Sequence, residues 1–99
     1  MVVVVFRNRL RPDVEADYGP RADEILELAR QTPGFVSFKA FTADDGERLA
    51  LSEFESEEAV RVWGAHLEHR KAQQEGRDRY YAEYTLQICS VSRASSFPS

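Results

Sequence analysis

The amino-acid sequence predicts one α+β domain, and three observations support this prediction. The chain has 99 residues, which is the usual length of a single domain. Its residues are 42% hydrophobic and 30% charged, as in an ordinary globular protein that can bury a core. Apolar residues alternate along short β-branched segments and recur every three to four residues in longer ones, so both strands and helices are expected.

The first predicted strand covers residues 2–10. Its β-branched residues favour a strand, and Pro12 ends the run because proline has no N–H to donate to a sheet. Side chains alternate between the two faces of a strand. One face would carry Val2, Val4, Phe6, Asn8 and Leu10, and the other Val3, Val5, Arg7 and Arg9.

A helix is predicted after this strand, with Asp13 as its N-cap. The Gly19-Pro20 pair should kink or restart it, because proline inside a helix costs about 3 kcal/mol. The strongest helical segment is therefore residues 21–31. One stripe at helical spacing would face the core, and it consists of Val14, Tyr18, Ala22, Ile25 and Ala29.

Two further strands, residues 35–42 and 48–54, form a predicted hairpin that turns at Asp45-Gly46. Ser56 follows as the N-cap candidate of a second helix. That helix extends to about residue 79 and can bend or split at either of two glycines, Gly64 and Gly76.

The last predicted strand covers residues 82–93. Its alternation places Tyr84, Leu86 and Ile88 on one face and Cys89 and Val91 on the other. We expect the domain to comprise residues 1–93, followed by a flexible tail over residues 94–99.

The element order is strand, helix, strand, strand, helix, strand. This order is typical of a ferredoxin-like antiparallel sheet with both helical segments on one face. Apolar residues nevertheless lie on both faces of the first strand, so the second face also needs a cover. A second copy of the chain would bury both open faces at once, and we therefore expect a homodimer.

Composition excludes several classes of function. The net charge of −4 argues against nucleic acid or an anionic membrane as a partner. The single cysteine, Cys89, cannot form an intrachain disulfide, which fits a cytoplasmic location. The apolar start, residues 1–6, is shorter than the core of a signal peptide and lacks a basic leader. No segment approaches the roughly 20 apolar residues of a membrane-spanning helix.

The first candidate site residue is Asn8, whose amide the alternation sends to the apolar side of the sheet. A buried amide without partners costs about 1–3 kcal/mol, so the protein or a ligand must satisfy it. Alternatively, Asn8 reaches water at the rim of the sheet.

The second helix carries a stripe of polar and aromatic residues, consisting of Trp63, His66, Arg70, Gln73 and Arg77. Beside a cavity, Trp63 could stack on a flat substrate, His66 could move a proton, and an arginine could stabilise an oxyanion. Alternatively, Trp63 is ordinary core and the remaining residues form a solvated helix face.

Signals for other chemistry are weak. His66 and His69 form an H-x-x-H pair, but zinc needs three or four ligands and the spacing is not that of known zinc helices. Tyr80, Tyr81 and Tyr84 could line a pocket, although aromatic residues at such a corner are more often packing. No motif indicates a nicotinamide, a flavin or a nucleotide, so no cofactor and no metal are expected.

Three stretches, residues 6–12, 33–63 and 66–93, resemble the antibiotic biosynthesis monooxygenase family of small dimeric α+β barrels. The most specific element is a tryptophan followed by spaced histidines and then "GRDRYY". The resemblance implies a subunit that pairs through its sheet and has a pocket between sheet and helices. Some members oxygenate phenols or anthrones with O2 alone, and others bind and degrade haem.

The resemblance also implies roles for individual residues. Only Asn8 and Trp63 match pocket positions of the family. On the cofactor-free mechanism Trp63 would stack on the substrate, Asn8 would orient its carbonyl, and His66 or an arginine would take the proton or stabilise the charge. The remaining candidate substrate contacts are Arg70, Gln73, Arg77 and Tyr80. Haem-degrading relatives ligate iron through a histidine at the position of Gln73, and an amide is a poor ligand. The expected function is therefore a cofactor-independent monooxygenase acting on a small aromatic substrate. A non-catalytic ligand-binding dimer and a haem-binding relative are the alternatives.

Overall fold

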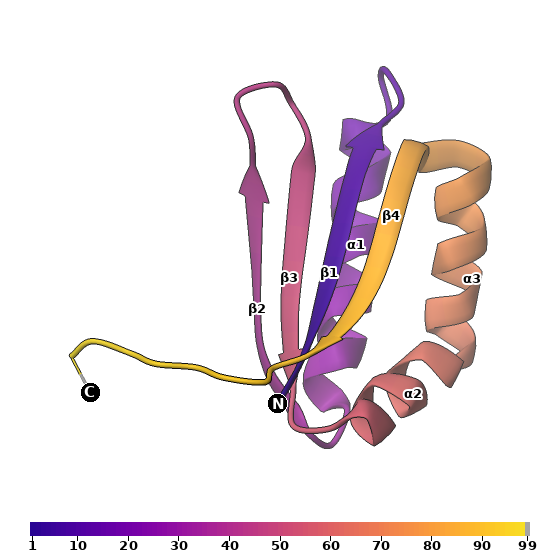
Figure 1. The fold of residues 1–99 in the computed structure, drawn as a ribbon. Helices are drawn as coiled ribbons and strands as arrows, with labels where there is room; N and C mark the ends of the chain where they lie inside the picture. Colours follow the sequence, from indigo (N-terminus) through magenta and orange to yellow (C-terminus); the bar gives the residue numbers. More distant parts are fainter. Residues whose placement is uncertain (99) are drawn as a thin grey trace.

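The computed structural model describes residues 1–98, apart from the side chains of Leu67, Glu68, His69 and Ala72. A four-stranded antiparallel sheet lies in front of the helices in Figure 1. The elements follow in the order β1 (Val2–Leu10), α1 (Glu15–Gln31), β2 (Phe35–Thr42), β3 (Arg48–Phe54), α2 (Glu57–Ala65), α3 (Leu67–Glu75), the π-helical turn η1 (Gly76–Tyr80) and β4 (Tyr81–Ser90).

The strand order is β2-β3-β1-β4, and every neighbouring pair is antiparallel. This confirms the predicted ferredoxin-like α+β fold. The register places Asn8 opposite Arg48 on β3 and Tyr84 on β4. Residues directly opposite one another share a face, so these three side chains all belong to the helix-covered side of the sheet.

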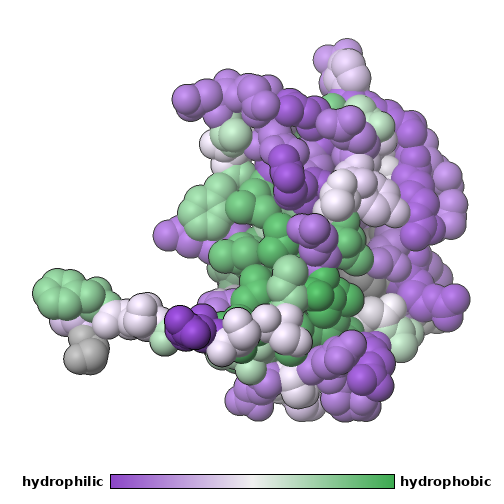
Figure 2. Space-filling view, viewed as in Figure 1, coloured by the Kyte–Doolittle hydropathy of each residue, from purple (hydrophilic) through white to green (hydrophobic). Residues whose placement is uncertain are grey.

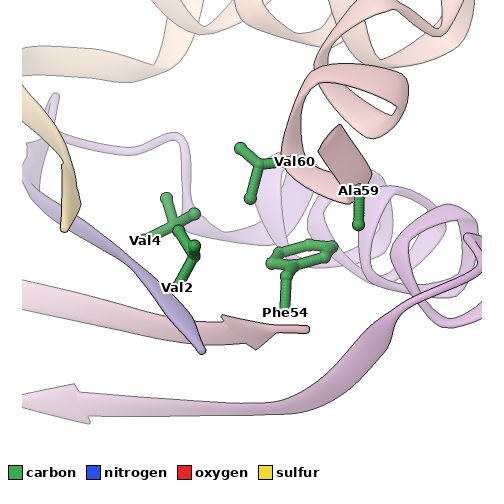
Figure 3. Packing of buried hydrophobic residues seen from close by; sticks show 5 residues of the cluster. All are labelled: Val2, Val4, Phe54, Ala59 and Val60. Carbon is green, nitrogen blue, oxygen red and sulfur yellow. The ribbon is translucent and has the colours of Figure 1, made fainter. Parts of the chain in front are cut away.

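The core lies between one end of the sheet and α2. Figure 3 shows five of its side chains, which are Val2, Val4, Phe54, Ala59 and Val60. Phe54 is fully buried, and burying such a side chain stabilises the fold by about 1.5–3 kcal/mol. Trp63 is partly buried and packs against this cluster. The start of β1, the end of β3 and the first turns of α2 are thereby joined.

The first helix differs from expectation in two ways: the restart at Pro20, one of the two alternatives there, is wrong, and so is the N-cap. α1 continues through Pro20, so the helix does not restart there. The loss of one backbone hydrogen bond near the N-terminal end is tolerated because the apolar stripe packs inward on both sides of the proline. Asp13 is not the N-cap; it has a φ of 65°, and Val14 takes the cap position without a side-chain hydrogen bond. Aspartate tolerates this left-handed conformation.

The second helical region begins as predicted and splits at both glycines. The Ser56 hydroxyl accepts a hydrogen bond from the Ala59 N–H at 3.2 Å, which confirms the N-cap. α2 then ends just after Gly64, and His66 is extended, with a ψ of 133°. A second change, from α3 to the π-helical turn, falls at Gly76. The polar stripe predicted on one continuous helix therefore lies on separate segments.

The chain beyond β4 has neither helix nor strand over residues 91–98, and it extends away from the sheet in Figure 1. β4 itself ends at Ser90 rather than near residue 93. The division into a domain and a flexible tail stays a prediction. Within the described residues, the helices are too short or too polar to cross a lipid bilayer.

The face of the sheet opposite the helices is apolar at its centre. Figure 2 looks onto this face and shows a continuous hydrophobic area over the strands, with polar residues around it. The strand register assigns five apolar side chains to the open face, which are Val3, Val5, Phe41, Leu49 and Leu51. Arg7 pairs with Glu47 at 3.0 Å and Arg9 with Asp45 at 2.8 Å at one border of this area.

Candidate functional site

A cavity of about 220 Å³ lies between the helix-covered face of the sheet and the helices. Its lining comes from every strand and from α1, α2, α3 and η1. The lining residues are Val4, Phe6, Tyr18, Arg21, Ala22, Ile25, Leu26, Ala29, Phe38, Ala50, Ser52, Trp63, Gln73, Arg77, Tyr80, Tyr81, Tyr84 and Leu86. Tyr84 and Leu86 are 39% and 45% exposed, so the cavity opens to solvent beside β4.

Trp63 forms one wall of the cavity, where it also contacts the core. Its ring centroid lies 5.4 Å from that of Phe54, and the two planes differ by 30°. Phe54 therefore supports the indole from the core side. An indole held in this way offers a flat surface on which a planar ligand can stack.

Tyrosines from three elements line another part of the cavity. The Tyr18 hydroxyl on α1 and the Tyr81 hydroxyl on β4 are 2.7 Å apart and hydrogen-bonded. The Phe6 ring contacts the Tyr81 ring edge-on at 5.2 Å, and the Arg48 guanidinium lies 5.2 Å from the centre of the Tyr18 ring. This part of the cavity therefore combines aromatic walls with paired hydroxyl groups and a nearby positive charge.

The environment of Tyr81 disfavours its ionised form. Burial is the main cause that raises the pKa of its phenol above 10.0, and Tyr18 raises it further, both by charge repulsion and through the hydrogen bond. Arg48 acts in the opposite direction. The phenol of Tyr81 therefore stays protonated, and remains a hydrogen-bond donor, to a higher pH than an exposed tyrosine does.

Backbone contacts at the end of the π-helical turn fix the position of Tyr81. The Arg11 guanidinium donates hydrogen bonds to the main-chain oxygens of Arg77, Asp78 and Tyr81, at 2.7, 2.6 and 3.0 Å. A cation at the carbonyl end of a helical turn satisfies otherwise unpaired acceptors. Gly76 opens that turn, and a Cβ at this position would lie 2.5 Å from a carbon of the Tyr81 ring.

The arginines that line the cavity have different environments. The Arg77 Nε donates a hydrogen bond to the Tyr84 hydroxyl at 2.8 Å near the solvent-exposed side. The side chain of Arg21 instead forms ion pairs with Glu24 at 2.7 Å and with Glu75 at 3.0 Å, and the latter joins α1 to α3. Arg77 is therefore better placed to meet a ligand anion.

The seven residues predicted for the site fall into two groups. Trp63, Gln73, Arg77 and Tyr80 all line the cavity, whereas Asn8, His66 and Arg70 are not among its lining residues. His66 and Arg70 are exposed, because the break between α2 and α3 turns the two segments relative to one another. The side chain of His69, the second histidine of the H-x-x-H pair, lies outside the described residues.

Asn8 is buried, as alternation indicates, with an exposed fraction of 3%. Its Oδ1 has no hydrogen-bond partner among the described residues. It lies six residues along β1 from Val2, whose cross-strand partner is Phe54, the support of Trp63. At about 3.3 Å per residue, Asn8 and the Trp63 end of the sheet are roughly 20 Å apart along the strand.

Tyr18 and Arg21 were not predicted as site residues, and Tyr81 and Tyr84 were named as possible pocket-lining residues with packing as the alternative. Tyr18 was assigned to the inward stripe of the first helix, which is correct, but its hydroxyl partner is 63 positions away in sequence. Only the fold brings the two together. For Tyr81 the sequence signal was the doublet Tyr80-Tyr81 at the entry to the last strand, and both rings line the cavity.

Among the described lining residues there is no histidine that could ligate haem iron. Gln73 is the lining residue at the position of the iron-ligating histidine of haem-degrading relatives, and an amide is a poor iron ligand. The volume is also below the range of about 300–1,000 Å³ that is usual for pockets binding drug-sized molecules. Among the described residues, no three His, Cys, Asp or Glu side chains group together as a metal site.

The fold and this cavity define a small α+β protein with an aromatic-lined pocket between sheet and helices. The family model for antibiotic biosynthesis monooxygenases matches residues 1–75, which is most of the chain. The chain therefore belongs to the antibiotic biosynthesis monooxygenase family. It is also similar to the uncharacterized protein YqjZ of Bacillus subtilis (strain 168), with 29% identity over 94 residues that cover 95% of this chain and 82% of that protein.

Solved structures share the fold at low sequence identity. Rv0793 from Mycobacterium tuberculosis superimposes with a TM-score of 0.82 and 17% identity, covering 96% of this chain and 98% of that one. SnoaB, a cofactor-independent oxygenase from Streptomyces nogalater, gives a TM-score of 0.80 and 14% identity, covering 99% and 97%. At these identities the likeness shows the fold alone.

Proposed function

We propose that this protein is a cofactor-independent monooxygenase that oxidises a small phenolic or quinol-like aromatic compound with O2. The observation that carries the proposal is the cavity, with an indole wall at Trp63 and hydroxyl and guanidinium groups elsewhere in its lining. Membership of the family and the shared fold with the cofactor-independent oxygenase SnoaB support it.

The size of the cavity favours a substrate with one or two rings. An engineered protein cavity of about 150 Å³ accepts benzene. The cavity here is larger, at about 220 Å³, but it is smaller than typical pockets for drug-sized ligands. We therefore expect naphthol-sized compounds to fit better than three-ring anthrones.

In the proposed reaction the substrate itself supplies the electrons. A phenolate or enolate passes one electron to O2, and the two radicals combine at a ring or benzylic carbon to give a peroxide. Where that carbon is a CH2 group, loss of water from the peroxide leaves a carbonyl, so that CH2 and O2 become C=O and H2O. The protein needs only to bind the anion, orient it and limit the access of water.

The residues divide these tasks. Trp63 stacks on the ring, and Arg77 holds the oxyanion through guanidinium N–H groups other than the Nε that is bonded to Tyr84. Gln73 and Tyr80 complete the walls. Asn8 and His66 are not assigned contacts with the substrate, because neither lines the cavity.

Oxygen consumption tests this proposal. Wild-type protein is compared with Trp63→Leu in the presence of 1-naphthol, 1,4-dihydroxynaphthalene and anthrone, after treatment with a chelator. We expect at least one compound to be oxidised about tenfold faster than its spontaneous rate, and this gain to be lost in Trp63→Leu. Val62→Ala is the matched control, because Val62 is the neighbouring residue on α2 and is 51% exposed. Uptake at the spontaneous rate with every compound would contradict the proposal.

We also propose that two copies pair through their open sheet faces. The support is the apolar area of Figure 2, which would otherwise face water over the centre of the sheet. A reducing, cytoplasmic setting is consistent with the single cysteine, Cys89, which lies on the same face opposite Val3.

A further inference from the structure

The hydroxyl groups of Tyr18 and Tyr81 are hydrogen-bonded to each other, and one of their two protons is not used in this contact. Each phenol carries one proton and can also accept a hydrogen bond. In their contact of 2.7 Å, one hydroxyl donates and the other accepts, so the proton of the accepting hydroxyl is not used. The structure gives neither hydroxyl another hydrogen-bond partner among the described residues.

The surroundings of the pair favour an acceptor as its partner. The rings of Phe6, Tyr80 and Tyr84 lie against the two tyrosines, with centroids 5.5–5.7 Å away for the tyrosine contacts and 5.2 Å for Phe6. No carboxylate is among the described lining residues. The Arg48 guanidinium over the Tyr18 ring adds positive charge, which favours an electron-rich oxygen and disfavours a cation.

We propose that the Tyr18–Tyr81 pair donates a hydrogen bond to a carbonyl or phenolate oxygen of a bound one- or two-ring aromatic ligand. The inference rests on the proposed function only in using the same cavity. It adds a selection rule, which is that the ligand must present an oxygen acceptor and not a cationic donor. It also adds a third recognition element, since Trp63 stacks on the ring, Arg77 holds an oxyanion, and the tyrosine pair donates a hydrogen bond to a ligand oxygen.

Contacts with Gly76 and Arg11 also hold Tyr81, and with it the hydroxyl pair, in a fixed position. The Tyr81 ring fills the space that the missing side chain of Gly76 leaves, and Arg11 fixes the main-chain oxygen of Tyr81. A donor that is fixed before binding loses little conformational entropy when the ligand arrives. The hydroxyl pair therefore discriminates by position as well as by chemistry.

Two ligands of the same skeleton test the inference without any turnover. 1-Tetralone carries one carbonyl oxygen that tetralin lacks, and calorimetry gives the Kd of each. For wild-type protein we expect the Kd of tetralin divided by the Kd of tetralone to be greater than one. In the double variant Tyr18→Phe/Tyr81→Phe this ratio should fall roughly three- to tenfold, which is the usual effect of one hydrogen bond. Tetralin binding should change little, which shows that the cavity is intact.

An unchanged ratio in the double variant would overturn the inference, and so would the failure of wild-type protein to bind tetralone. The wild-type protein offers a second test if the double variant does not fold. 1-Aminotetralin, which is cationic at neutral pH, should bind more weakly than tetralone, and equal binding would overturn the inference. These results do not depend on oxygen chemistry, so they remain distinct from failure of the oxygenase proposal.

Discussion

Gly76 and Tyr81 share one space, because a Cβ on Gly76 would lie 2.5 and 2.8 Å from two carbons of the Tyr81 ring. The glycine is buried at the start of the π-helical turn, and the tyrosine begins β4 five residues later. The absence of a side chain at residue 76 is therefore a condition for the ring of Tyr81 to reach the cavity and the Tyr18 hydroxyl.

Replacing Gly76 with alanine should destabilise the protein by about 1–3 kcal/mol. Alanine is the better helix former, by up to about 1 kcal/mol, but the overlap with an aromatic ring in a packed site outweighs this gain. Gly64→Ala is the matched control, since a Cβ there meets nothing within 4 Å, and it should be neutral or stabilising. Urea denaturation measures both variants, and equal effects of the two substitutions would contradict the role assigned to Gly76.

Replacing Arg11 with methionine should cost about 1–2 kcal/mol of stability. The substitution keeps the unbranched apolar part of the side chain but removes three hydrogen bonds to main-chain oxygens, which include that of Tyr81. Arg61→Met serves as the control, because Arg61 is 68% exposed and its ion pairs among the described residues are with Glu57 and Glu58 on its own helix. We expect the control to stay within about 0.5 kcal/mol of the wild type. A similar loss in both variants would mean that the contacts of Arg11 have no special role.

Tyr81 should make the protein less stable in alkali. The folded state raises the pKa of Tyr81 above 10.0, its value in the unfolded chain, so above pH 10 the folded state binds more protons than the unfolded one. This stabilisation is fully present below pH 10 and is lost as the pH rises further. The urea midpoint should therefore drop between about pH 8 and about pH 11, and this drop should be smaller in Tyr81→Phe than in the wild type. An identical fall in both proteins would show that burial of Tyr81 has no such effect.

Charge on the open face of the sheet should prevent pairing of the chains. Val5→Lys places an ammonium group at the centre of the apolar area, and burying an unpaired charge in an interface is strongly unfavourable. We expect sedimentation to show dimers for the wild type and monomers for Val5→Lys. Val62→Lys makes the same change at an exposed position on α2 and should leave the dimer intact. Monomeric wild-type protein, or a dimeric Val5→Lys variant, would contradict pairing through the sheet.

Local patterns in the sequence predict most of the fold. Alternation defines β1, including the buried Asn8, and the cap at Ser56 and the two glycines of the second helical region behave as their residue types suggest. The restart at Pro20 fails because packing of the helix against the sheet outweighs the local cost of proline.

The site was less accessible to sequence reasoning. A stripe drawn on one ideal helix joins Trp63, His66 and Arg77, but the extended conformation at His66 breaks the helical phase. The residues before and after the break consequently point in directions that spacing does not give. The contact between Tyr18 and Tyr81 joins two segments far apart in the chain, so the local sequence of either segment does not predict it.

Under the proposed function, the protein inserts one atom of O2 into a small aromatic compound without help from a cofactor. Mass spectrometry of the product formed under ¹⁸O2 by chelator-treated protein tests this most directly. We expect one ¹⁸O atom per product molecule in wild-type reactions and, with Trp63→Leu, product only at the spontaneous rate. Product that carries oxygen from water, or the same labelled yield with and without the protein, would contradict it.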